Sequence, residues 1–154
     1  MNRTIDHIEI RRGTRSDLER VMMLNKEIFG EDRLINSLDH DYLLILLAEV
    51  GDIPVGFKIG YGLGSGIFYS AKGGVLPKWR RLGLARRLMH EMERIAVAEG
   101  FTEMRYHTFP TRWPGMLSLG RSEGYDVLEA SWNPVYRDYQ ILLFKKLDVA
   151  SGSL

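Results

Sequence analysis

Cysteine is absent from the 154 residues of this chain. The absence excludes a disulfide framework, a cysteine-ligated metal site and a thiol nucleophile, and it agrees with a reducing cytosol, so we expect a cytoplasmic protein. An excess of charge is missing too, because 21 Lys and Arg residues stand against 20 Asp and Glu residues. We therefore expect neither nucleic acid nor a membrane surface as a partner.

Long apolar runs are also missing. The longest, YLLILLAEV at 42–50, is too short to cross a bilayer, and the first residues, MNRTIDHIEIRRGTRSD, lack the apolar core of a signal peptide. No repeat interrupts the chain, and only ASGSL at 150–154 has the composition of a frayed tail. With 45% hydrophobic residues, the length suits one core, so we expect a single domain over 1–154.

Hydrophobic periodicity predicts how this domain is built. Apolar residues at spacings of three and four predict helices over 17–30, 32–40, 84–99 and 114–124. Alternating or short apolar runs predict strands over 7–14, 42–50, 53–62, 66–75, 102–108 and 136–147, with Thr14 or Ser16 as a helix cap and Gly30 as a helix stop. Hairpin strands followed by crossover helices predict an α/β (α+β) fold with a mixed sheet and helices on both faces.

The helix that starts near Leu84 has no ordinary cap. Arg80, Arg81, Leu82 and Gly83 stand where Ser, Thr, Asp or Asn would accept the first N–H groups. Those N–H groups, the positive end of the helix dipole and a glycine that admits close approach together make an anion site. A phosphate or pyrophosphate is the predicted cap, and water with two solvated arginines is the alternative.

The stretch VLPKWRRLGLA at 75–85 resembles the acyl-CoA-binding signature of the GNAT family of N-acetyltransferases. In that signature a strand ends, a Pro and an aromatic residue follow, and an Arg/Gln-x-x-Gly-x-Gly/Ala loop opens a helix. The order of the predicted elements also fits this family, and so do three further stretches: GFKIGY, EGYDV and YQILLFKKL. The resemblance implies a single-domain, mostly antiparallel sheet, and FYSAKGGVLPKWRRLGLA looks most like a bacterial subgroup of unassigned substrate.

The resemblance also implies acetyl-CoA as cosubstrate, with no metal. The unpaired main chain of Val75 would receive the pantetheine amides, the N–H groups from Arg81 to Arg86 would hold the pyrophosphate, and the backbone from Gly74 to Leu76 would lie near the thioester carbonyl. The full expected set is Val75, Leu76, Arg80, Arg81, Leu82, Gly83, Leu84, Ala85, Arg86 and Trp113. Trp113 is alternatively a core aromatic residue.

Without cysteine, we expect a bound amine to attack acetyl-CoA directly. An alkyl amine with a pKa of about 10.4 is mostly protonated at neutral pH, and its deprotonation costs roughly 4 to 5 kcal/mol, so a base or a water chain is needed. The candidates are Glu27, Glu31, Asp32, Tyr69 and His107. The alternative for Glu27 and Glu31 is a surface charge, and for His107 a solvated strand face shared with Glu103 and Arg105.

Two departures from the family pattern bear on activity. Gly120 stands where many members carry a Tyr that protonates the leaving thiolate, and Trp113 stands where an Asn often contacts the cofactor. Either the thiolate leaves without a protein acid, which a thiol pKa of about 8.5 permits, or the site has diverged from that of an active transferase. The second hypothesis is therefore an acyl-CoA-binding or sensing module with little transferase activity.

The acceptor amine stays open among small molecules, peptide N-termini and lysines. The segments at 28–40 and 60–66 are expected to select it, and the second of these, GYGLGSG, is predicted to be a hairpin because it matches no nucleotide-binding spacing. HEMER at 90–94 and LDHDY at 38–42 lack the pattern of a metal site and suit charged surfaces. Exposed edge strands would allow a homodimer.

Overall fold

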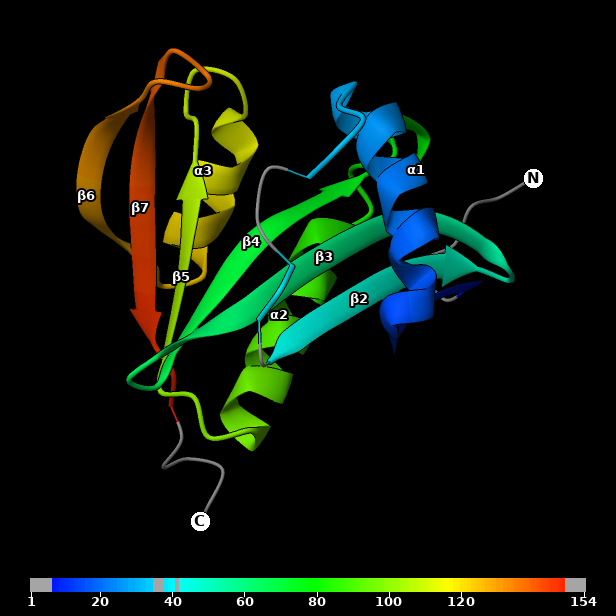
Figure 1. Cartoon of the computed structure of the whole chain (residues 1–154), viewed down its shortest axis with the longest axis horizontal. Helices are drawn as coiled ribbons and strands as arrows, with labels where there is room; N and C mark the ends of the chain where they lie inside the picture. Colours follow the sequence, from blue (N-terminus) through cyan, green and yellow to red (C-terminus); the bar gives the residue numbers. More distant parts are fainter. Residues whose placement is uncertain (1–6, 35–37, 41, 149–154) are drawn as a thin grey trace. The chain divides into compact units, whose positions relative to one another are not determined.

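The computed structural model describes residues 7–34, 38–40 and 42–148. Figure 1 shows its helices and strands. In chain order the elements are β1 (Ile8–Arg12), η2 (Arg15–Asp17), α1 (Leu18–Phe29), β2 (Leu43–Val50), β3 (Ile53–Gly64), β4 (Ile67–Val75), η3 (Pro77–Trp79), α2 (Leu84–Ala98), β5 (Glu103–Thr108), α3 (Pro114–Ser122), β6 (Asp126–Asn133) and β7 (Asp138–Lys146). The expected tail at 150–154 lies outside the described residues.

The strands form one seven-stranded sheet in the order β1-β2-β3-β4-β5-β7-β6. β4 and β5 run parallel, while β1–β2, β2–β3, β5–β7 and β6–β7 are antiparallel. The predicted single-domain α+β fold with a mixed, mostly antiparallel sheet is therefore confirmed. The chain forms two compact units: unit 1 comprises residues 1–62 and 71–95, and unit 2 comprises residues 63–70 and 96–154.

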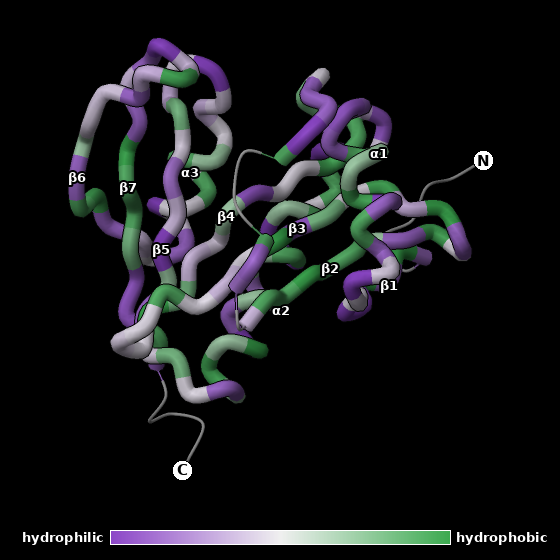
Figure 2. Tube along the Cα trace, viewed as in Figure 1, coloured by the Kyte–Doolittle hydropathy of each residue, from purple (hydrophilic) through white to green (hydrophobic). Residues whose placement is uncertain are grey.

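Unit 1 is built around β2 and β3. Residues Leu44 to Leu47 are at most 2% exposed, because α1 lies over one face of these strands and α2 lies on the other (Figure 1). Figure 2 shows β2 as hydrophobic over most of its length, which is the pattern of a strand buried on both faces. On the α1 side the core consists of Val21, Leu24, Ile45, Leu47, Phe57 and Ile59.

The C-terminal end of α1 follows the predicted signal, whereas its N-cap residue is Asp17 and not the predicted Thr14 or Ser16. Thr14 caps the short helix η2, and its N–H donates to Asp17 Oδ2 at 2.8 Å. Arg11 pairs with Asp17 at 2.9 Å and also with Glu49, so hydrogen bonds from Arg11 hold the pKa of Asp17 well below its usual range. Gly30 ends α1 in the left-handed region at φ 71°, where glycine has no steric penalty.

One predicted helix is wrong, and one strand was not predicted. The helix expected at 32–40 is wrong for residues 32–34 and 38–40, which are not helical, and 35–37 lie outside the described residues. Glu31 is bonded to Asn25 of α1 and to Lys72 of β4, and these two contacts hold the chain after α1 in a non-helical path. Strand β6 was not predicted, because its first five residues are exposed and show no alternation of burial, and it forms through pairing with β7.

In unit 2, α3 packs against Tyr106 of β5. The Tyr106 hydroxyl donates to the Met116 carbonyl at 2.8 Å, and the Tyr106 ring meets Tyr125 edge-to-face at 5.1 Å. A Cβ atom on Gly120 would stand 1.9 Å from that hydroxyl oxygen. Gly120 is therefore required here for space, since the tyrosine hydroxyl lies where a side chain would begin.

We predict that Gly120→Ala destabilises the fold by about 1–3 kcal/mol, because the new methyl group collides with Tyr106. Gly115→Ala is the matched control in the same helix, since a Cβ on Gly115 meets nothing within 4 Å. Adding Tyr106→Phe, which alone costs about 1 kcal/mol for the lost hydrogen bond, should relieve part of the Gly120→Ala penalty. Urea unfolding of the four variants checks this; additive effects would contradict the contact.

Candidate functional site

The N-terminus of α2 emerges from a turn with an unusual backbone. Arg81 and Gly83 both have positive φ angles, 65° and 77°, and the first bond onto the helix runs from Arg87 N to Gly83 O at 3.0 Å. A Cβ on Gly83 would meet nothing within 4 Å, so this side of the turn is open. Left-handed residues in such a turn direct successive N–H groups into a concave anion site at the positive end of the helix.

Strand β4 ends beside this turn. Val75 is 6% exposed, and the next residue, Leu76, donates its N–H to Val55 O at 2.8 Å. The Val75 carbonyl accepts a hydrogen bond from Arg80 Nε at 2.9 Å. The expectation that the Val75 main chain is unpaired is therefore wrong for its carbonyl, because the side chain of Arg80 folds back onto the strand end.

Glycines let other elements approach the end of β4 closely. A Cβ on Gly73 would stand 2.9 Å from Phe57 O, and one on Gly74 would stand 3.0 Å from both Ile28 Cγ2 and Phe29 Cζ. Larger residues at either position would push β3 or α1 away. The pair Gly73 and Gly74 thus sets the packing of unit 1 around the backbone that the family resemblance assigns to the thioester.

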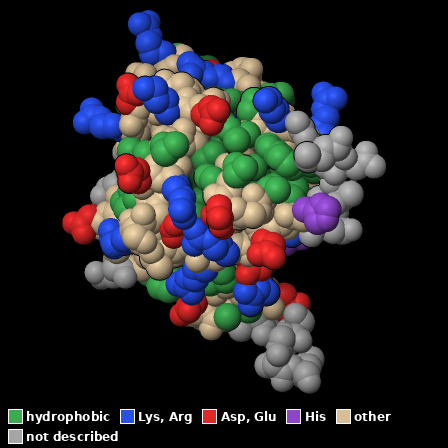
Figure 3. Space-filling model, turned by 90° about the vertical axis from the view of Figure 1, so that its right-hand side faces the viewer, with side chains coloured by type: hydrophobic (Ala, Val, Ile, Leu, Met, Phe, Trp, Pro, Cys, Tyr) green, Lys and Arg blue, Asp and Glu red, His purple; other side chains and the backbone are tan. Residues whose placement is uncertain are grey.

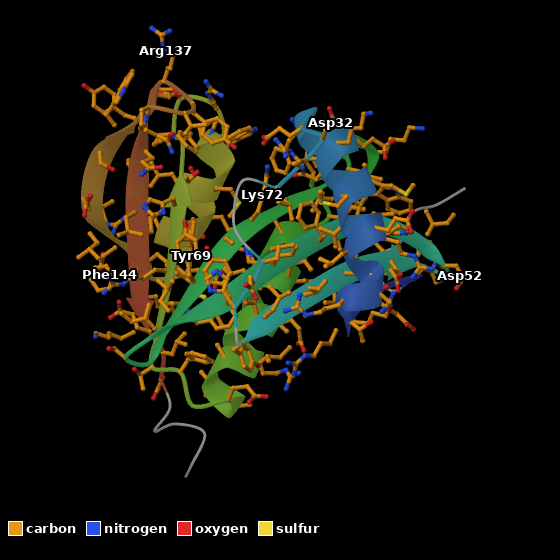
Figure 4. The ribbon with its side chains drawn as sticks, in the orientation of Figure 1. Asp32, Asp52, Tyr69, Lys72, Arg137 and Phe144 are labelled. Atoms are coloured by element: carbon orange, nitrogen blue, oxygen red, sulfur yellow. The ribbon has the colours of Figure 1, made fainter. Side chains whose placement is uncertain are left out.

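Lys72 connects the same strand to the chain after α1. Its Nζ lies 3.1 Å from Glu31 Oε2 and 4.4 Å from the centre of the Phe29 ring. Asn25, fully buried on α1, donates to the Glu31 carbonyl at 3.0 Å. Glu31 is thus held by a cation, whereas Glu27 is exposed on α1 and Asp32 pairs with Lys26 at the surface. Figure 4 labels Lys72 and Asp32.

Tyr69 and His107 form a hydrogen-bonded pair in unit 2. Tyr69 Oη lies 2.6 Å from His107 Nδ1, and the rings meet edge-to-face at 5.6 Å. The parallel register of β4 and β5 sets Tyr69 opposite Arg105, two residues before His107. Burial lowers the pKa of His107 and the charge of Glu129 partly opposes this, so the imidazole is neutral at pH 7 and fit to accept a proton.

A family model described as the acetyltransferase (GNAT) family matches residues 11–112, more than half of the chain. This chain belongs to the GNAT family. As a member of an acetyltransferase family it is an acyltransferase. A search of curated proteins finds no significant match.

Solved structures share this GNAT fold at low sequence identity. The ribosomal-protein-S18-alanine N-acetyltransferase from Escherichia coli aligns with a TM-score of 0.80 and 14% identity over 96% of this chain and 98% of that one. A GNAT acetyltransferase from Elizabethkingia anophelis with acetyl-CoA bound aligns with a TM-score of 0.77 and 17% identity over 92% and 99%. The PaiA N-acetyltransferase from Thermoplasma acidophilum in complex with coenzyme A gives 0.71 and 18% over 90% and 98%.

Other expected GNAT site residues lie as follows. Trp113 precedes α3, is 37% exposed and meets Phe109 edge-to-face at 6.0 Å, so it is a partly exposed aromatic residue and not a fully buried one.

Across the described part of the chain, no three His, Asp or Glu side chains are arranged to hold a metal ion. None of the helices described is long and apolar enough to cross a membrane. On the face in Figure 3, basic and acidic side chains are interspersed.

Sequence reasoning missed two contacts of the site. The ion pair between Lys72 and Glu31 joins residues 41 positions apart, counting from 31 to 72, and no local pattern marks it. The bond from Arg80 to Val75 spans five residues, but it depends on the turn made by η3, whose Pro77 was read as part of the family signature. In contrast, Tyr69 and His107 were both candidates, and the structure brings them together.

We predict that the imidazole of His107 titrates below the ordinary histidine value of about 6.5. Because the folded pKa is lowered, the neutral form stabilises the fold, and this stability is lost as the pH falls below about 6.5. NMR titration of the ring proton, assigned with His107→Gln, measures the midpoint. A midpoint at or above about 6.5 would contradict a lowering of the pKa by burial.

Proposed function

We propose that this protein transfers an acetyl group from acetyl-CoA to a primary amine. The observation that carries the proposal is the open, left-handed turn at Arg81 and Gly83 before α2, in a chain of the GNAT family. Two GNAT structures with the same fold hold acetyl-CoA or coenzyme A. These support the cosubstrate, while the acceptor and the chemical step are our inference.

The pyrophosphate would lie against the N–H groups from Arg81 to Arg86, where the helix dipole and nearby guanidinium groups stabilise its charge. A Cβ at Gly83 would project into open space, so this backbone is accessible to a bulky anion. The pantetheine amides would pair with the main chain of Val75, and Leu76 follows at the strand end. Leu82 lies in the turn, and Leu84 and Ala85 are the first two residues of α2.

Acetyl transfer would proceed by direct attack. The amine nitrogen bonds to the thioester carbonyl carbon, the carbon–sulfur bond breaks, and the CoA thiolate leaves with the electron pair. N–H groups of the backbone from Gly74 to Leu76 would stabilise the developing oxyanion. The amine must lose a proton, and we assign its removal to the pair of Tyr69 and His107, because the neutral imidazole and the phenol share a hydrogen bond of 2.6 Å.

The carboxylate candidates have less support as the base. The carboxylate of Glu31 is engaged in an ion pair with Lys72 at 3.1 Å. Glu27 is an exposed side chain on α1 and is retained as the alternative base. The departing thiolate needs no tyrosine at position 120, since thiols ionise near pH 8.5.

The second candidate function is an acyl-CoA-binding or sensing module. It is favoured by one observation: the space beside Gly120 is filled by the Tyr106 hydroxyl, which donates to Met116, so the tyrosine acid common in the family has no place there. Saturable acetyl-CoA binding without acetylation of any amine in a broad panel would favour this function over the transferase.

We propose that residues 1–154 form a single cytoplasmic acetyltransferase domain, which acts on an amine without a metal and without nucleic acid. β1 and β6 are the edge strands of the sheet, and exposed apolar side chains gather on β6 and β7, namely Val127, Leu128, Trp132 and Tyr139. A homodimer through the β6 edge would cover them.

Gly83→Asp is expected to weaken coenzyme A binding at least 100-fold, because it places a carboxylate against the pyrophosphate at the positive end of α2. Gly83→Asn is the matched control: it has the same size and a similar tolerance of positive φ, and it adds no charge, so its loss should be much smaller. Isothermal titration with acetyl-CoA, coenzyme A and ATP measures the affinities, and thermal unfolding checks the fold.

Equal affinity in wild-type protein and Gly83→Asp would place the cofactor elsewhere. Wild-type protein that binds neither acetyl-CoA nor coenzyme A, and gains no thermal stability from either at high excess, would overturn the proposed cosubstrate altogether. In that case water caps α2.

Tyr69→Phe and His107→Gln are each expected to lower kcat by a factor of about 10² to 10⁴, the usual contribution of a general base, while coenzyme A affinity stays unchanged. The measurement is the turnover of the best amine from the panel, followed over pH. If Glu27→Gln slows the reaction more than either variant, the exposed carboxylate is the base.

A further inference from the structure

One hydrogen bond joins two groups that the proposed cofactor site uses separately. Arg80 Nε donates to the Val75 carbonyl at 2.9 Å. Val75 is a buried residue at the end of β4, while Arg80 is exposed in the turn before α2. In the proposed site, the guanidinium of Arg80 binds the phosphate and the carbonyl of Val75 binds pantetheine. In this structure the two groups are instead bonded to each other.

The turn between the two residues explains how the side chain reaches back. Helix η3 over Pro77–Trp79 is closed by bonds from Trp79 N to Leu76 O at 2.8 Å and from Arg80 N to Pro77 O at 3.4 Å. This tight turn returns Arg80 to the strand that the chain has just left. The Leu76 N–H donates to Val55 O at 2.8 Å, so pairing with β3 continues past Val75.

The energetics favour an exchange of partners when a phosphate arrives. A guanidinium forms stronger and often bidentate bonds with phosphate than with a neutral carbonyl. The carbonyl of a buried residue is costly to leave unpaired, so it needs a replacement donor once Arg80 moves. The amide N–H of a pantetheine arm supplies that donor from the same ligand.

We propose that Arg80 is a cofactor-positioning residue with two alternative partners: the Val75 carbonyl in the protein alone, and the pyrophosphate in the complex with acetyl-CoA. The inference rests on the proposed function. It couples the two halves of the cofactor, because binding of the pyrophosphate removes Arg80 from Val75 and thereby prepares the carbonyl for the pantetheine arm. Such coupling acts equally in both directions.

The test separates the halves of the cofactor. ADP carries the pyrophosphate without the pantetheine arm, and S-acetylpantetheine carries the arm without phosphate. In the wild-type protein, saturating ADP should tighten S-acetylpantetheine binding about five- to tenfold, measured by NMR titration. In Arg80→Met this coupling should vanish: S-acetylpantetheine alone should bind as tightly as it does to the wild type with ADP, while coenzyme A binds about tenfold more weakly.

Arg81→Met is the matched control, since it removes the same charge from the same turn and leaves the bond from Arg80 to Val75 in place. It should weaken coenzyme A and keep the coupling between ADP and S-acetylpantetheine. A second readout is the Nε–H signal of Arg80, assigned with Arg80→Lys. We expect it to shift on addition of coenzyme A and to be protected from solvent exchange in the protein alone, unlike a fully solvated guanidinium.

The results distinguish failure of the inference from failure of the function. Coenzyme A binding without coupling in the wild type, coupling that persists in Arg80→Met, or an Arg80 signal that coenzyme A does not move would each overturn the exchange and leave the cosubstrate intact. Loss of S-acetylpantetheine affinity in Arg80→Met would show that Arg80 only supports the turn. A wild-type protein that does not bind coenzyme A would overturn the proposed function and the exchange with it.

Discussion

The rest of the structure depends on how the main chain is satisfied between the end of β4 and the start of α2. Within this short stretch a strand ends at Val75, a buried residue, and a helix of 15 residues begins after Gly83, which has no side chain to cap it. Both ends leave backbone groups that a folded protein must pair. The side chain of Arg80 pairs the carbonyl, and the helix N–H groups point into an open turn. An anionic ligand with an amide-bearing arm matches both demands.

Close packing of backbones makes this junction rigid enough to be a site. An added Cβ atom would stand about 3 Å from β4 at Gly56, from β3 at Gly73 and from α1 at Gly74. The ammonium of Lys72 and the carboxylate of Glu31 then fix the chain after α1 against β4. An ion pair that is partly buried and also supported by an aromatic ring loses less to solvent screening than an exposed pair. The groups around Gly74 are thus set before any substrate arrives.

In unit 2, Tyr106 and Tyr69 have different roles, which follow from their hydrogen-bond partners. Tyr106 donates to a helix carbonyl and fills the space over Gly120, which is a structural role that also removes the place of a tyrosine acid. The hydroxyl of Tyr69 is hydrogen-bonded to a ring nitrogen of His107, whose pKa burial lowers. In the function that we propose, no tyrosine acid acts at position 120, and the pair formed between β4 and β5 removes the proton of the amine.

The sequence by itself determined most of the elements, the mixed sheet and the turn before α2. The reason is that the hydrophobic period, Gly30 and the stretch from Arg80 to Gly83 are local signals. It did not reveal β6, whose residues are mostly exposed and become a strand only by pairing with β7. It also could not choose among the candidate bases. Only the tertiary structure decided three contacts: Tyr69 with His107, Lys72 with Glu31, and Arg80 with Val75. Each of them depends on strand register or turn geometry, which spacing along the chain does not encode.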